Sequence, residues 1–340
     1  MLLVACCGKQ LIMRWTFLAA PVLVVALVCP SALFAGPSTD AVAAPVFQEW
    51  QIWEVKTGLV LPFEELLRAL GQLDVIYLGE EHHNQWHVEA ARQILQTLLL
   101  QGLHPILALE MFGWDGQAAL DRYLADKEWG RDSFLKESHW EQSWGGAFGD
   151  YEPLVALARA QGLPVLALNP PKQLVRLVAK QGLAQALTDP EMARWGMKGE
   201  VLVDEPAYHD MIVKPLRQCH GGLSDNAYQR MYEASMFRDE GMAKTIAEAL
   251  RRKSTGTTPD ARTQNGPIVS YTGGGHIQYR LPVPNRVLRR REGAVKQATI
   301  YLTSFEPSRA EELRSLMQED VADYLWLTPI GAQGAPKRCR

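Results

Sequence analysis

Cysteine is scarce in this sequence. Only five cysteines occur in 340 residues, and Cys6, Cys7 and Cys29 all lie close to the N-terminus. The two others, Cys219 and Cys339, can form one disulfide bond at most. The sequence therefore excludes a disulfide framework and a metal cluster built from cysteines.

The chain also lacks an excess of charge of either sign. Its 35 Lys and Arg residues nearly balance 38 Asp and Glu residues, which gives a net charge of -3. Nucleic-acid binding depends on clustered Lys and Arg that neutralise phosphates. The one basic run, RVLRRREG at 286–293, is typical of a solvated helix end or loop. We therefore expect no nucleic acid among the partners.

Several catalytic motifs are missing. No serine lies in a glycine-x-Ser-x-glycine turn, and no glycine-rich loop matches a phosphate-binding loop. GGGH at 273–276 lacks the spacing and the downstream acid of a dinucleotide site. EEHHNQWH at 80–87 reverses the HExxH order of zinc proteases. The sequence therefore does not indicate a serine hydrolase with this turn, a phosphate-loop or dinucleotide-binding protein, or an HExxH zinc protease.

Residues 1–35 have the order of a secretory leader. Lys9 and Arg14 precede a long apolar run, and small residues follow it, with Ala35 in a position for cleavage. The apolar run is also long enough to anchor the chain in a membrane, and the weak lipidation motif ALVC leaves lipid attachment open. We expect an exported protein whose leader is not part of the fold.

Continuous apolar segments alternate with amphipathic helices from about residue 64. The alternation predicts strands at 75–78, 104–112, 163–169, 266–273, 297–303 and 323–328. A helical pattern that ends at Gly71 precedes the first strand. Patterns that end at Gly102 and Gly162 separate the first strand from the second and the second from the third. Strands that are apolar throughout are buried on both faces. The predicted fold class is therefore α/β, with a mainly parallel β-sheet covered by helices on both faces.

Strand signals disappear between residues 174 and 250, where the segments are helical in pattern. We interpret 174–250 as a helical insertion or cap that forms a smaller subdomain. The α/β core domain then consists of 45–173 and 251–330. The polar loop at 254–266 has no periodicity, and we expect it to be mobile.

Polar side chains follow four of the predicted strands at the point where each strand ends. Glu80 and His82 follow the first strand, and Glu110 ends the second. Asn169 ends the third strand, and His276 follows the fourth. Ligands of an open parallel sheet bind beyond the carboxyl ends of its strands. We therefore expect these side chains to converge on one cleft.

Carboxylate and imidazole groups at this density suit two kinds of chemistry. Glu80, His82, Glu110 and His276 can form a general acid–base centre or bind a divalent metal. Groups of these types can also hold a ligand that carries carboxylates. The nearby His87 lies on the helix that follows the first strand, where we expect it to be exposed.

Several unlike motifs together resemble the ChaN family. LGEEHHNQWHVEAARQIL, ALEMFGWDGQAALDRYL, MFRDEGMA and GGGHIQYRLPVPNRVLRR occur in the order and spacing of that family, over about residues 60–295. ChaN proteins are haem-binding, iron-regulated envelope proteins of Gram-negative bacteria, often lipoproteins, in the Tiki/TraB/erythromycin-esterase-like superfamily. The resemblance implies a homodimer that holds paired haems, located in the periplasm or attached to the outer membrane.

The resemblance also implies roles for individual residues. Glu80, His82, Glu110 and His276 match the metal or acid–base centre of the superfamily's hydrolases, and another shared position lies in MFRDEGMA. We therefore predict these four residues as catalytic groups or as metal ligands.

In ChaN proteins a tyrosine binds the haem iron, and a histidine and a lysine of the partner subunit contact the propionates. PAYHDMIVK contains Tyr208, His209 and Lys214. We predict Tyr208 as the ligand of ferric haem, because phenolate is a hard anion, and the other two as propionate contacts. Tyr228 and Tyr232 are the alternative ligands.

Two functions from different classes follow. The first is an envelope haem-binding protein that takes part in haem and iron acquisition, with outer-membrane haem uptake machinery as a partner. The second is an enzyme, a metal-assisted hydrolase that uses the strand-end residues. Similarity of fold does not decide between them, but the motifs are closer to ChaN and favour the first.

Overall fold

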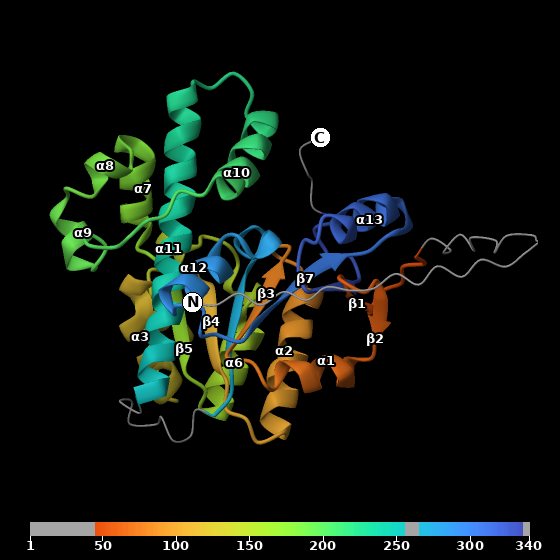
Figure 1. The fold of residues 1–340 in the computed structure, drawn as a ribbon. Helices are drawn as coiled ribbons and strands as arrows, with labels where there is room; N and C mark the ends of the chain where they lie inside the picture. Colours follow the sequence, from red (N-terminus) through yellow and green to blue (C-terminus); the bar gives the residue numbers. More distant parts are fainter. Residues whose placement is uncertain (1–44, 256–264, 336–340) are drawn as a thin grey trace, which may run out of the picture. The chain divides into compact units, whose positions relative to one another are not determined.

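A sheet of eight strands forms the centre of the fold (Figure 1). The computed structural model describes residues 45–255 and 265–335. The predicted leader at 1–35 lies outside the described residues, and so does most of the predicted mobile loop at 254–266. The described residues belong to one compact unit.

Six neighbouring strands of the sheet are parallel, and the apolar segments of the sequence predict all six. They are β3 Val75–Glu80, β4 Ile106–Gly113, β5 Val165–Asn169, β6 Ile268–Gly273, β7 Gln297–Ser304 and β8 Tyr324–Thr328. The hairpin of β1 Ile52–Glu54 and β2 Leu59–Leu61 is not predicted, because such short strands carry no readable periodicity. β1 pairs antiparallel with β2 and β8, which gives the order β2-β1-β8-β7-β3-β6-β4-β5.

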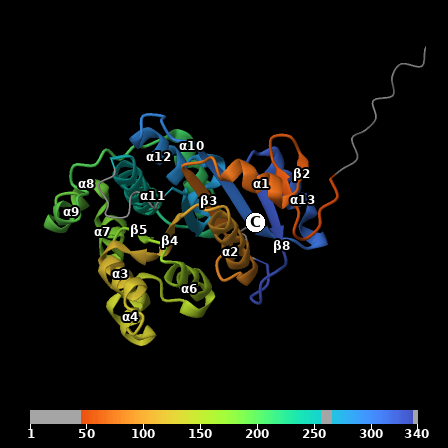
Figure 2. The ribbon, with the colours of Figure 1, turned by 90° about the horizontal axis from the view of Figure 1, so that it is seen from below.

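Helices cover both faces of the sheet, as the sequence predicts. One layer consists of α1 Phe63–Leu70, α2 Gln85–Leu100, α3 Gln117–Ala125 and α6 Glu152–Gln161 (Figures 1 and 2). The other consists of α11 Asp225–Thr255, α12 Val283–Arg290 and α13 Ala310–Gln318. The short helices α4 Arg131–Glu137 and α5 Trp140–Ser143 lie between α3 and α6 in the chain. Each layer packs on the sheet through its own hydrophobic cluster, so both faces are buried.

The remaining helices form a smaller helical part together with the first half of α11. They are α7 Lys172–Gln181, α8 Leu183–Ala186, α9 Pro190–Arg194 and α10 Pro206–Cys219. Phe237 of α11 packs with α7 to α9, and Tyr232 packs with α10, in two small clusters. α11 continues without a break onto the sheet (Figure 1), where Met242 and Ile246 join the core. The predicted insertion at 174–250 thus ends inside a helix that serves both parts.

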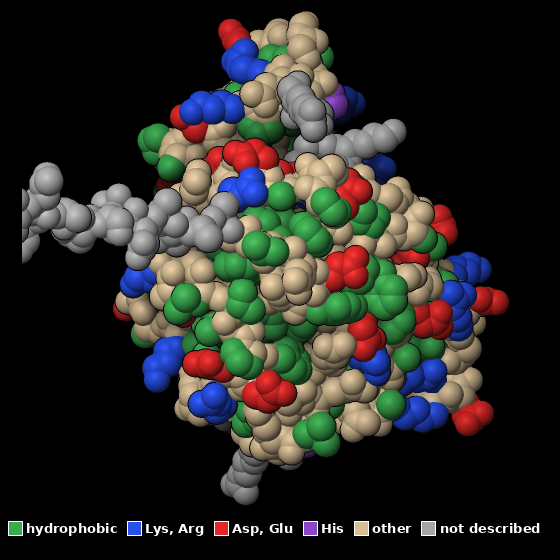
Figure 3. All heavy atoms as spheres, turned by 90° about the vertical axis from the view of Figure 1, so that its right-hand side faces the viewer, with side chains coloured by type: hydrophobic (Ala, Val, Ile, Leu, Met, Phe, Trp, Pro, Cys, Tyr) green, Lys and Arg blue, Asp and Glu red, His purple; other side chains and the backbone are tan. Residues whose placement is uncertain are grey.

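The face that carries the edge strand β2 is mixed in character. Figure 3 shows hydrophobic side chains there in groups between acidic and basic ones. Leu59 and Val60 of β2 are 61% and 45% exposed, so they are only partly covered by the rest of the chain. Among the helices of the described ranges, none combines the length and the apolar character needed to cross a membrane.

Candidate functional site

The carboxyl ends of β3, β4, β5 and β6 meet around a cavity of about 250 Å³. It is lined by His82, Glu110, Gly113, Ser143, Trp144, Asn169, Pro170, Lys172, Val175 and Arg238. Glu80 and His276 lie directly behind the lining, in contact with His82 and Glu110. The structure therefore brings together the five side chains that the strand-end rule selects in the sequence.

Glu80 and His82 form a hydrogen-bonded pair at the end of β3. Oε1 of Glu80 lies 2.8 Å from Nδ1 of His82. The same carboxylate accepts hydrogen bonds from the hydroxyls of Tyr151 at 3.0 Å and Tyr271 at 2.6 Å. Burial raises the pKa of Glu80, although the hydrogen bonds to its carboxylate oppose this. Burial lowers the pKa of His82, but its bond to Glu80 and the charge of Glu110 outweigh burial and raise it. Both shifts favour a proton held between Glu80 and His82.

Glu110 is the centre of a second polar group. Its Oε2 accepts the backbone N–H of Gly273 at 2.6 Å. Its Oε1 lies 2.5 Å from Nη2 of Arg238 and 3.2 Å from Nε2 of His276. On the other side of the ring, Nδ1 of His276 lies 2.5 Å from Oδ1 of Asp239. His276 is thus held between two carboxylates.

Neighbouring charges set the direction of the pKa shifts of His276 and Glu110. Burial lowers the pKa of His276, but the carboxylates of Glu110 and Asp239 outweigh burial and raise it to about 9. Burial raises the pKa of Glu110, whereas His276 and Arg238 outweigh it and hold that pKa well below its ordinary value. Nη2 of Arg238 also lies 2.9 Å from Nε2 of His276. Both nitrogens are donors when His276 is protonated, so the Glu110 oxygen that they share holds them together.

Tyr208 connects this group to the helical part. Its hydroxyl donates to Oδ2 of Asp239 at 2.5 Å, and its side chain is fully buried. Cζ of Arg286 lies 4.1 Å from the centre of the Tyr208 ring. Burial, followed by the charge of Asp239, raises the pKa of Tyr208 well above its ordinary value. The predicted haem ligand is therefore a protonated phenol inside the protein, bonded to the partner of His276.

The alternative haem ligands are buried as well. Tyr228 is 3% exposed and donates to a backbone carbonyl, and Tyr232 is 1% exposed and donates to Asp204, each at 2.5 Å. In contrast, the side chains of His209 and Lys214 on α10 are 35% and 72% exposed. The three predicted haem-site residues of α10 do not share one surface, and the identity of the haem ligand stays a prediction.

The segments 79–82 and 273–276, which both have the sequence glycine-x-x-histidine, pack against each other. A Cβ atom on Gly273 would lie 2.7 Å from Cε1 of His82, and one on Gly79 would lie 2.6 Å from the side chain of Ile277. Each glycine thus leaves room for the segment that follows the neighbouring strand, because β3 and β6 are paired. A side chain at either position would push the strand ends apart.

Other polar residues of the 80–87 segment have structural partners. Glu81 bonds to Ser304 and Arg309 beyond the end of β7. His87 is fully buried, and its Nδ1 accepts the backbone N–H of Glu81 at 2.9 Å. Burial lowers the pKa of His87 to about 4. The expectation of an exposed His87 is wrong, because the turn after β3 needs an internal hydrogen-bond acceptor.

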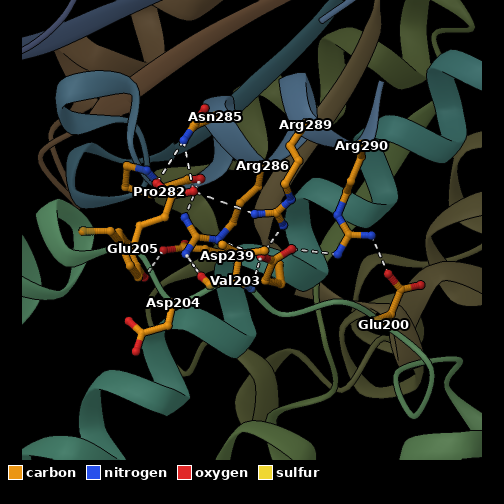
Figure 4. Close-up of polar contacts among 12 residues, drawn as sticks. Glu200, Val203, Asp204, Glu205, Asp239, Pro282, Asn285, Arg286, Arg289 and Arg290 are labelled. Atoms are coloured by element: carbon orange, nitrogen blue, oxygen red, sulfur yellow. Dashed lines mark hydrogen bonds and ion pairs between the residues drawn. The ribbon is translucent and has the colours of Figure 1, made fainter. Parts of the chain in front are cut away.

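The basic run at the end of α12 is not solvated, contrary to its sequence pattern. Arg286 is fully buried and lies 3.2 Å from the buried carboxylate of Glu240. Arg289 and Arg290 approach the same carboxylate to 2.5 and 2.7 Å. Arg290 also pairs with Glu200. Figure 4 shows the three arginines extending from α12 in the same direction, with Arg290 bonded to Glu200. The ion pairs with Glu240 and Glu200 tie α12 to α11 and to the segment before α10.

The predicted metal ligands are held in two separate hydrogen-bonded groups. Within the described residues, no three His, Cys, Asp or Glu side chains are arranged to hold a metal ion. Glu80 and His82 bond to each other, while Glu110 and His276 share Arg238. Metal binding by these residues would require an exchange of these bonds and stays a prediction. The arrangement as it stands suits proton transfer at His82.

Some residues of the site do not lie at the end of a strand, so the strand-end rule does not select them. Trp144 lies in a loop, and its ring centre is 4.9 Å from that of His82, in an edge-to-face arrangement. Lys172 begins α7 three residues after Asn169. Tyr271 could have been predicted as a site residue from the sequence. It lies two residues before Gly273, and positions two apart in a strand face the same side of the sheet.

Comparisons with known proteins identify the family of the chain. Residues 66–287 match the family described as haem-binding uptake, Tiki superfamily, ChaN. The curated Protein RETICULATA-RELATED 5, chloroplastic, of Arabidopsis thaliana is 25% identical over 280 residues, which cover 78% of this chain and 35% of the relative. This chain therefore spans about a third of the length of that relative.

One solved structure of a ChaN protein shares the fold. The structure described as cofacial heme binding to ChaN of Campylobacter jejuni has a TM-score of 0.61 at 17% identity, over 82% of this chain and 96% of that chain. A mutant of the erythromycin esterase EreC in its open conformation has a TM-score of 0.40 at 14% identity, over 71% of this chain and 72% of that chain. The α/β arrangement derived from the apolar segments is thus found in a known haem-binding structure.

Proposed function

Because this chain belongs to the ChaN family of haem-binding uptake proteins in the Tiki superfamily, we propose that it is an exported protein that coordinates ferric haem through a tyrosine and takes part in haem and iron acquisition. The match over residues 66–287 carries the proposal, since that range includes both the strand-end cavity and the helical part. Haem binding itself follows from family membership. The ferric state, the tyrosine and the physiological role are the parts that need a test.

Tyr208 must change its surroundings before it binds haem iron. Its hydroxyl is buried and donates to Asp239, so the oxygen is not accessible in this conformation. Within α10 only Tyr208 and Val213 are fully buried, while its other apolar residues are partly exposed, so a movement of the helix would uncover a small hydrophobic cluster. As a phenolate, the tyrosine would supply a hard anionic ligand that favours ferric iron.

His209 and Lys214 support the proposal from the surface of α10. Nζ of Lys214 lies 2.9 Å from Asp210, and both side chains are mostly exposed. A surface ion pair of this kind is screened by solvent and contributes little to stability, so a haem propionate can replace Asp210 at little cost. The exposed positions point to contacts with a second molecule. We therefore propose a homodimer in which these residues meet the propionates of the haem bound to the partner subunit.

Two features support a location in the periplasm or at the outer membrane. The order of residues in 1–35 is that of a secretory leader. Cys219 at the end of α10 is disulfide-bonded, and disulfide bonds persist in oxidising compartments such as the bacterial periplasm. Its expected partner, Cys339, lies outside the described residues. The outer-membrane haem uptake machinery is the proposed partner in such a location.

Haem titration of the full chain, purified from an envelope extract, tests the main proposal. We expect ferric haem to bind with a Kd of about 1 μM or less, with the absorption spectrum of tyrosinate-bound haem. Reduction should release the haem, because ferrous iron does not favour phenolate. Light scattering should show a dimer in the haem complex. A spectrum identical to that of free haem would contradict the proposal.

The Glu80–His82 pair favours a second function, hydrolysis at the strand-end cavity. Glu80 holds the imidazole through Nδ1, and Nε2 has no hydrogen-bond partner among the described residues. This arrangement allows the imidazole to take a proton from water while the buried carboxylate stabilises the charged ring. We propose it as an alternative, with metal assistance tested by adding a chelator.

Hydrolysis of a panel of activated esters tests the alternative. His82→Gln should reduce the rate by about a hundredfold or more, the usual contribution of a general base. His104→Gln is the control, because His104 is exposed and lies outside the cavity lining. Equal rates in the two variants would rule out a catalytic His82.

A further inference from the structure

The first turn of α7 brings positive charge to the strand-end cavity. Lys172 and Val175 line the cavity together with Arg238 of α11. Arg176 follows Lys172 by four residues and therefore lies on the same side of the helix. The first turn of α7 contains no acidic residue. Within the described part of the chain, neither Lys172 nor Arg176 forms an ion pair.

The carboxylate in the lining, Glu110, balances the charge of Arg238 but not that of Lys172. Glu110 is 1% exposed, and its oxygens are already engaged by Gly273, Arg238 and His276. Burial, followed by the charges of Arg176 and Arg238, lowers the pKa of Lys172, in keeping with the place of Lys172 and Arg238 in the same cavity lining. The cavity therefore offers a ligand more positive than negative charge.

We propose that the cavity binds an anionic group, a carboxylate or a phosphate, between Lys172 and Arg238. Such a group would supply the negative partner that Lys172 lacks, through charge-assisted hydrogen bonds. The positive end of the α7 helix dipole adds to the attraction. The ligand's anionic group would then lie beside the imidazole of His82. This inference goes beyond haem binding and does not depend on it.

The size of the cavity limits the ligand. Its volume of about 250 Å³ is below the range of about 300–1,000 Å³ found for sites that enclose a drug-sized molecule. A whole porphyrin does not fit, whereas a small organic acid, a phosphate ester or one propionate arm does. The edge-to-face pair of Trp144 and His82 provides an apolar wall for the carbon part of such a group.

Calorimetric titration of the full chain with inorganic phosphate and with succinate tests the proposal. We expect the wild-type protein to bind at least one probe, and affinity to fall as salt is added. Lys172→Gln should weaken binding about tenfold, the effect of losing one charge-assisted bond. Lys180→Gln is the matched control, since Lys180 is exposed on the same helix but outside the cavity lining. It should change affinity less than about twofold.

Two results would overturn the proposal: no binding of either probe tighter than about 10 mM, or equal affinity in the wild type and Lys172→Gln. A haem titration with and without the bound probe identifies the natural source of the anion. Competition assigns the cavity to a haem propionate, and absence of competition assigns it to a separate small anion. A chain that binds phosphate but not haem would refute the haem proposal and leave this one standing.

Discussion

The imidazole of His82 packs so closely on the backbone of Gly273 that no Cβ atom fits between them. A Cβ atom at position 273 would lie 2.7 Å from Cε1 and 2.9 Å from Nε2 of the ring. His82 follows β3 and Gly273 ends β6, so this contact joins the two strand ends that build the site.

Gly273→Ala should therefore lower the free energy of unfolding by about 1–3 kcal/mol, the usual cost of overpacking. The methyl group would also push His82 away from Glu80. Gly275→Ala is the matched control, because a Cβ atom there meets nothing within 4 Å. Urea denaturation of both variants decides the matter, and equal loss of stability would contradict the role of the close contact.

Tyr208→Phe should abolish the tyrosinate spectrum of the haem complex. It should also cost about 1–3 kcal/mol of stability, because Oδ2 of Asp239 loses its buried donor. Tyr77→Phe is the control, since it removes a buried hydroxyl that donates to Gln297, away from the helical part. Haem titration of both variants is the measurement. An unchanged spectrum for Tyr208→Phe would eliminate Tyr208 as the ligand.

Asp239→Asn should lower the pKa of His276 from about 9, because it removes one of the two carboxylates that raise it. A histidine with a raised pKa stabilises the fold fully below its ordinary value near 6.5, and that contribution is lost as the pH rises through about 9. In the variant the loss should be smaller and should be complete at a lower pH. NMR titration of the imidazole tests the shift, with Asp204→Asn as the control. An unchanged pKa in Asp239→Asn would show that the ion pair is unimportant.

His87 should have the opposite effect on stability. Its pKa is lowered to about 4, so below pH 6.5 the unfolded chain binds a proton that the folded chain does not. Stability should fall as the pH falls from 6.5 to 4, by roughly 3 kcal/mol at about 1.4 kcal/mol per pKa unit. His87→Asn keeps an acceptor near Glu81 and should reduce this slope. Denaturation at both ends of the range tests it; parallel curves for variant and wild type would point to other groups.

The sequence predicts the sheet and the residues at its edge because both depend on local pattern. Continuously apolar runs such as Val75–Leu78 mark buried parallel strands, and the polar residue that ends each run marks the edge where ligands bind. Glu80, Glu110 and Asn169 are located in this way, and the structure places them together.

Contacts between distant segments could not be predicted in the same way. The bond between Tyr208 and Asp239 depends on the path of α10 across α11, and no periodicity reports that path. The burial of Arg286 depends on a carboxylate 46 positions earlier in the chain, at Glu240. A basic run without its partner looks like a solvated surface. Pairing with a distant residue can thus bury a charged segment that composition alone would place at the surface.

Asp239 divides its two carboxylate oxygens between two regions of the molecule. Oδ1 holds His276 at the edge of the sheet, and Oδ2 holds Tyr208 on α10. Any event that draws Tyr208 away changes the proton affinity of His276, and linkage requires the reverse effect to be equally large. Asp239 thereby couples α10 to the edge of the sheet. The proton affinity of His276 and the position of Tyr208 depend on each other.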